Sequence, residues 1–192
     1  MISSATFHVI TTELVVGSFA MAGVCFLLKA IQSFNVLTSE KTSQVSDIVG
    51  HFALGFGLIA TPFAILSGIS SSPGSDVSSP LLVNKILLSM IATGLAIAAI
   101  YARYSIGEKI WMSKASSVTQ SSTGLAASGF MLLTASAGGK FTRNESLVDL
   151  LNLPYDTIFL MPIWATSIIL LIGISTTVLA VLGLRNQSTI QH

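Results

Sequence analysis

Residues 7–31, FHVITTELVVGSFAMAGVCFLLKAI, form an apolar stretch long enough to cross a membrane as a single helix. The hydrocarbon core of a bilayer is about 30 Å thick, and about 20 helical residues span it. Three further stretches pass the same test, at residues 48–69, 81–104 and 158–184. Because a helix satisfies its backbone hydrogen bonds internally in lipid, we expect an all-α integral membrane bundle.

A fifth segment, residues 119–139, reads TQSSTGLAASGFMLLTASAGG and is uncharged but only mildly apolar. Its small residues, among them Gly124, Ala127 and Ser128, are typical of helices packed between other helices, because they allow close backbone approach. We therefore predict five transmembrane helices in a single membrane domain covering residues 1–192. The alternative is four, with residues 119–139 amphipathic or re-entrant.

The composition also favours a membrane location. Of the 192 residues, 52% are hydrophobic and 9% are charged, whereas soluble domains carry about 25% charged residues. The formal net charge is only +1, so the chain lacks the strong positive potential that would attract nucleic acid. We expect membrane lipids and other membrane subunits as partners.

The distribution of Lys and Arg predicts the orientation, because these residues are enriched in cytoplasmic loops. With five spans, one side of the membrane holds Lys29, Lys41, Arg103, Lys109, Lys114 and Arg185, and the other holds Lys85, Lys140 and Arg143. The predicted location is the plasma membrane, with the N-terminus outside and the C-terminus in the cytoplasm. With four spans, the C-terminus lies outside.

Two ionisable residues fall inside predicted spans and could form an intramembrane pair. Glu13 lies about two turns into the first span, and Lys85 lies near the outer end of the third. Charges inside a bilayer are costly and often mark function, so a Glu13–Lys85 pair is a candidate proton or ligand site. The alternative is a structural pair, or side chains that extend to the interface.

His8, Asp47 and His51 are candidate ligands for haem or a metal such as copper. Asp47 and His51 are four residues apart and therefore share a helical face, where they could bind a metal or relay a proton. The other interpretation is that Asp47 caps the helix and fixes the tautomer of His51. His8 and His51 are predicted near opposite membrane surfaces, so we do not expect them to share one haem iron.

Three short features resemble a family of small bacterial and archaeal membrane proteins of unknown function, for which haem binding has been suggested. They are His8, residues 65–68 (ILSG) and residues 135–140 (ASAGGK). The resemblance covers residues 7–140 and implies a multi-helix membrane fold. The chain departs from the family pattern in two places: no proline follows His8, and Asn84 and Lys85 stand where the family carries a histidine.

In its short length and its lack of a soluble domain, the chain is also similar to accessory subunits of archaeal energy-converting complexes, such as ammonia monooxygenase or a terminal oxidase. The sequence has no Walker loop, GxSxG, HExxH or CxxC motif, so we expect no catalysis by the chain alone. The favoured hypothesis is a non-catalytic accessory subunit of a larger membrane complex. The alternatives are a haem- or metal-binding redox protein and a small transporter or channel.

Overall fold

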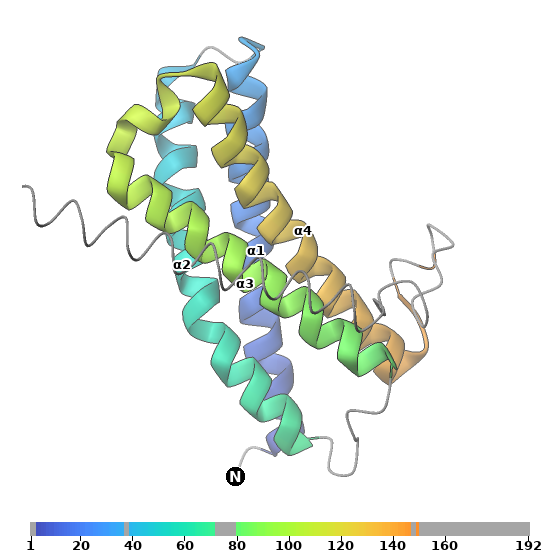
Figure 1. Ribbon diagram of the computed structural model, residues 1–192. Coiled ribbons are helices and arrows are strands. Elements are labelled where there is room, and N and C mark those ends of the chain that lie inside the picture. Colours follow the sequence, from blue (N-terminus) through green and yellow to red (C-terminus); the bar gives the residue numbers. More distant parts are fainter. Residues whose placement is uncertain (1–2, 37–38, 72–79, 147–148, 150–192) are drawn as a thin grey trace, which may run out of the picture. The chain divides into compact units, whose positions relative to one another are not determined.

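The computed structural model describes residues 3–36, 39–71, 80–146 and 149, which belong to one compact unit, Met1–Tyr155. These residues form four long helices, α1 (Ser4–Ser33), α2 (Glu40–Ser71), α3 (Pro80–Ile106) and α4 (Lys114–Arg143), and a short 3-10 helix, η1 (Gly107–Trp111) (Figure 1). The all-α prediction is therefore confirmed for the described residues. A single domain over residues 1–192 stays a prediction.

Local sequence signals explain where these helices begin and end. The Ser3 and Ser113 hydroxyls each accept a backbone N–H bond three residues later, which caps α1 and α4. Pro80 starts α3, where its missing N–H is harmless. Gly107 ends α3 with a φ of 68°, and Asn144 ends α4 with a φ of 58°.

The helices pack as neighbouring antiparallel pairs. α1 packs extensively against α2 and also against α4, α3 packs mainly on α4, and α2 and α3 make much less contact (Figure 1). Small residues allow the closest approaches: a β-carbon at Gly57 would stand 2.7 Å from the Phe19 ring, and one at Gly124 would overlap the Phe26 ring. Both rings are fully buried, so these contacts position α2 and α4 on α1.

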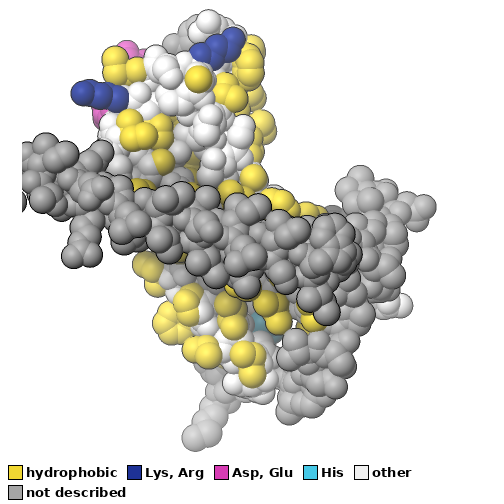
Figure 2. Space-filling model, viewed as in Figure 1, with side chains coloured by type: hydrophobic (Ala, Val, Ile, Leu, Met, Phe, Trp, Pro, Cys, Tyr) yellow, Lys and Arg dark blue, Asp and Glu magenta, His cyan; other side chains and the backbone are white. Residues whose placement is uncertain are grey.

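Among the described residues, three helical segments are long and apolar enough to cross a membrane: Ser4–Ser33, Glu40–Ser71 and Leu81–Trp111. The chain is thus a multi-pass membrane protein by length and composition. On the face that Figure 2 shows, hydrophobic side chains form several exposed patches on the described part, and Lys and Arg side chains lie toward its upper end.

The prediction of five spans is not upheld for the described residues. α4 contains the predicted segment 119–139 and is a continuous helix of 30 residues, but it is not apolar enough to count as a candidate span. Its Ser, Thr and Gly residues lower its hydropathy while they allow it to pack against α1 and α3. The predicted last span, 158–184, lies outside the described residues.

Candidate functional site: a polar clamp at one end of the bundle

An ion pair between α2 and α3 forms the centre of the candidate site. The Arg103 Nε donates to both Asp47 oxygens, at 3.1 and 2.9 Å, and its second guanidinium nitrogen lies 2.8 Å from Oδ2. Asp47 is only 7% exposed. A bidentate pair of this kind fixes direction as well as distance, and it joins two helices that otherwise make little contact.

His51 and Gln120 extend this pair to α4. The His51 Nδ1 lies 2.8 Å from the Asp47 backbone oxygen and 3.1 Å from its Oδ1. The Gln120 side-chain nitrogen lies 2.9 Å from the His51 Nε2 and donates to the Ala99 carbonyl at 2.8 Å. These contacts are satisfied when the His51 Nδ1 carries the proton and Nε2 accepts. We call Asp47, His51, Arg103 and Gln120 the polar clamp.

Lys29 of α1 lies beside the polar clamp and is also buried, with 5% exposure. Its Nζ donates to the Ser43 hydroxyl at 2.7 Å and lies 4.1 Å from the centre of the Trp111 ring. Trp111 in turn meets His51 edge to face, with ring centres 6.2 Å apart. All five helical elements therefore contribute a polar or aromatic side chain to this end of the bundle, which we call the clamp end.

The arrangement in the polar clamp is suited to holding helices together. Both Asp47 oxygens and both His51 ring nitrogens contact protein groups, so a metal would have to displace these contacts. Elsewhere in residues 3–36, 39–71, 80–146 and 149 there is also no group of three or more His, Cys, Asp and Glu residues that could hold a metal ion. The predicted Asp47–His51 contact exists, and Asp47 lies two turns inside α2, away from the helix start.

His8 lies at the opposite end, which we call the His8 end. Its Nδ1 lies 3.1 Å from the Ser67 hydroxyl, which is also 3.1 Å from the Thr11 hydroxyl. Ser67 follows His51 by 16 residues on α2, or about 24 Å at about 1.5 Å per residue. The two histidines are thus kept apart, as expected from the sequence.

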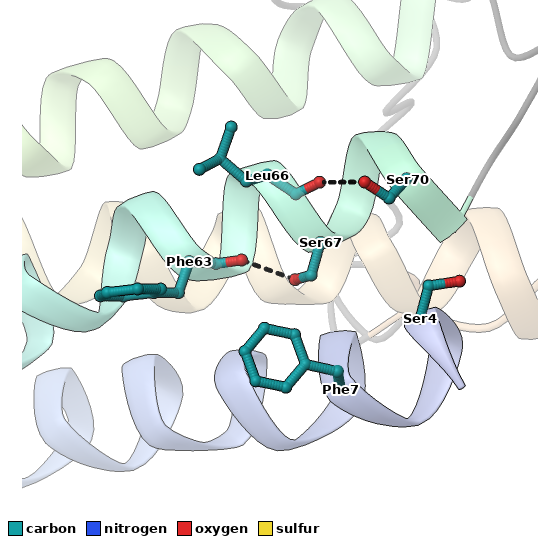
Figure 3. Close-up of a pocket in the computed structure, with 6 residues that line it drawn as sticks. All are labelled: Ser4, Phe7, Phe63, Leu66, Ser67 and Ser70. Carbon is teal, nitrogen blue, oxygen red and sulfur yellow. Dashed lines mark hydrogen bonds between the residues drawn. The ribbon is translucent and has the colours of Figure 1, made fainter. Parts of the chain in front are cut away.

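A shallow pocket of about 280 Å³ opens between α1 and α2 beside Ser67 (Figure 3). Its walls are the side chains of Phe7, Phe63 and Leu66 with Ser4, Ser67 and Ser70. The Ser67 and Ser70 hydroxyls donate to backbone carbonyls four residues earlier, at 2.6 and 3.0 Å, as the dashed lines in Figure 3 mark. The pocket therefore offers a mainly apolar surface with few available polar groups.

Glu13 and Lys85 are not brought together in an ion pair within the part of the chain that the structure describes. Glu13 is exposed on the surface of α1. The Lys85 Nζ lies against Gly138 of α4, 3.3 Å from where a β-carbon would stand. The sequence places Glu13 and Lys85 at a similar depth in their helices. In the structure, however, the two side chains point in different directions.

Sequence reasoning missed three contributors to the clamp end, Lys29, Arg103 and Gln120. In the sequence, Lys29 and Arg103 contribute only to the charge difference between the two membrane sides, and Gln120 is one polar residue within a segment of small ones. The available signal was position, because all three fall within two turns of the same predicted membrane surface as Asp47. Comparisons with protein-family models, with curated proteins and with solved structures found no match for this chain.

Proposed function

We propose that this chain is a non-catalytic subunit of a larger membrane protein complex. One observation carries the proposal: Glu13 presents a carboxylate on the exposed side of a candidate membrane span. In residues that the structure describes, this carboxylate has no ion pair or hydrogen-bond partner. An isolated charge facing acyl chains is costly, and a neighbouring protein that covers Glu13 would remove that cost.

The spacing along α1 supports a position for Glu13 inside the hydrocarbon layer. Glu13 and Lys29 are 16 residues apart, which is about 24 Å along a helix. A hydrocarbon core is about 30 Å thick, so at least one of the two residues lies within it. Exposed apolar residues stand on both sides of Glu13, Ile10 before it and Leu14 after it, which places Glu13 within the apolar part of the helix surface. Lys29 is buried among protein groups, whereas Glu13 is exposed.

No Lys or Arg in the described part of the chain forms an ion pair with Glu13. Among the described ones, Arg103 pairs with Asp47, Lys140 pairs with Asp149, and Lys29 contacts Ser43. Lys41, Lys109 and Lys114 belong to the clamp end, Arg143 ends α4, and the Lys85 Nζ lies against Gly138 of α4. The predicted span at 158–184 has no Lys, Arg or His.

The orientation proposed for the subunit places the clamp end in the cytoplasm of the cell that carries it in its plasma membrane. Among described residues, this end has five basic residues, Lys29, Lys41, Arg103, Lys109 and Lys114, and the His8 end has Lys85, Lys140 and Arg143. The difference follows the positive-inside pattern. Labelling of single cysteines at residues 36 and 144 in intact cells, after replacing Cys25 with Ser, tests it: only the latter should react with an impermeant maleimide.

Extraction from native membranes into lipid nanodiscs, followed by intact-mass measurement, tests the proposed function. We expect the chain in a particle that also contains at least one different polypeptide. If that polypeptide belongs to an oxidase or monooxygenase, the class of complex expected from the sequence also gains support. Particles that contain only this chain and lipid would contradict the proposal.

A further inference from the structure

We propose that the outward face of α1 is the docking surface for a partner membrane helix that carries a Lys or Arg side chain at the depth of Glu13. This inference rests on the proposed function and names the part of the chain that meets the partner. The docking face consists of the exposed residues Ile10, Glu13, Leu14, Gly17, Met21 and Val24. Their spacing of three and four residues places them along one side of the helix.

The position of α1 in the bundle leaves this side open. α1 packs against α2 and α4, and the residues that face those helices, including Val15, Phe19 and Ala22, are buried. The docking face alternates with them along the sequence. Among the described helices none packs on this side of α1, which makes it the side that we assign to another polypeptide.

The exposed face of α2 provides an internal comparison, because it has the composition expected for contact with lipid. Its exposed residues are Ile48, Phe52, Phe56, Ile59, Phe63 and Leu66, which are large and apolar. The docking face of α1 has a carboxylate and, one turn later, Gly17, where a β-carbon would meet nothing within 4 Å. A bare surface at that position lets a second helix approach closely.

The charge on Glu13 determines the chemistry of the occupant. A carboxylate that remains ionised next to acyl chains requires an opposite charge close by. The described Lys and Arg residues do not pair with Glu13, and the sequence of the predicted span at 158–184 contains no Lys or Arg. The positive group that faces Glu13 therefore comes from a different polypeptide, as a Lys or Arg on the helix that lies over Gly17.

Photocrosslinking in native membranes tests the location of this contact. A photoreactive phenylalanine analogue at position 14 is compared with the same analogue at position 56 on α2. We expect position 14 to form an adduct with a different polypeptide, through a helix that contains Lys or Arg, and position 56 to react with lipid. An adduct to a second copy of this chain, or equal protein adducts at both positions, would overturn the inference.

Charge exchange tests the chemistry. We expect Glu13→Lys to lower the adduct yield about tenfold, and reversal of the cross-linked basic residue to Glu to lower it similarly. Combining the two changes should restore most of the yield. Gly17→Leu should also reduce it, whereas Gly55→Leu on α2, where a β-carbon also has open space, should not. An unchanged yield in Glu13→Lys, or no restoration in the double variant, would overturn the cationic partner.

Failure of this inference is distinguishable from failure of the proposed function. If a different polypeptide co-purifies but cross-links only to residues outside the docking face, the docking surface is wrong and the subunit function stands. If no different polypeptide co-purifies, the subunit function itself is wrong. Bundle integrity in each variant is checked by its resistance to unfolding in detergent.

Discussion

The two ends of the described bundle are held together by different chemistry. At the clamp end, the ion pair of Asp47 and Arg103 joins α2 to α3, and Gln120 links α4 to His51. At the His8 end, His8 and Thr11 bond the Ser67 hydroxyl and join α1 to α2 through uncharged groups. The comparison teaches that charged, multiply bonded side chains hold α2 and α3 together where apolar packing between them is sparse.

Breaking the central ion pair should have the largest effect. We expect Asp47→Ala to destabilise the bundle by about 3–5 kcal/mol, because Arg103 is left partly buried without its counter-charge. The measurement is unfolding in mixed micelles as the fraction of denaturing detergent is raised. Glu108→Gln is the control, since that carboxylate is exposed and only 3.9 Å from Arg103, and it should change stability by less than about 0.5 kcal/mol.

Removing both charges distinguishes an unpaired charge from lost packing. We expect the double variant Asp47→Ala with Arg103→Leu to be more stable than Asp47→Ala alone, because no charge remains without a partner. The same unfolding titration gives the comparison. A double variant that is less stable than either single variant would show that the two side chains contribute mainly through packing.

Gln120→Leu should have the next largest effect, about 2 kcal/mol. The change leaves the His51 Nε2 without its donor and removes a second bond to the Ala99 carbonyl, which keeps its helical bond; a buried polar atom left unsatisfied costs about 1–3 kcal/mol. Cysteine cross-links between α3 and α4 at the clamp end report local opening. Ser122→Leu on the exposed side of α4 is the matched control and should leave that opening unchanged.

Ser67→Ala at the His8 end should have the smallest effect, about 0.6–1 kcal/mol, in the range of interhelical polar contacts in membranes. It removes the bonds to His8 and Thr11 while leaving the clamp end intact. Ser70→Ala, which loses only a local bond to the Leu66 carbonyl, is its control. A loss at Ser67 as large as the loss at Asp47 would remove the distinction between the two ends.

Local patterns in the sequence predicted much of the fold and little of the site. Each predicted span within the described residues corresponds to a helix, and each helix extends beyond its prediction because polar turns such as residues 40–47 continue it. The Asp47–His51 contact was predictable because four-residue spacing fixes a shared face. Contacts between helices were not predictable, because they depend on how each helix is rotated about its axis. Glu13 and Lys85 lie at a similar depth, but their side chains do not point toward each other. Arg103 and Gln120 come from separate helices and meet at the clamp end.

The most direct test of the proposed subunit role is the intact mass of particles extracted from native membranes. The particles that contain the unaltered chain are compared with those that contain the Glu13→Gln variant. We expect the unaltered chain to carry a different polypeptide, and Glu13→Gln to lose most of it while its own resistance to unfolding stays the same. An unaltered chain found only with lipid would contradict the subunit role, and a Glu13→Gln variant that retains its partner in full would contradict the docking surface on α1.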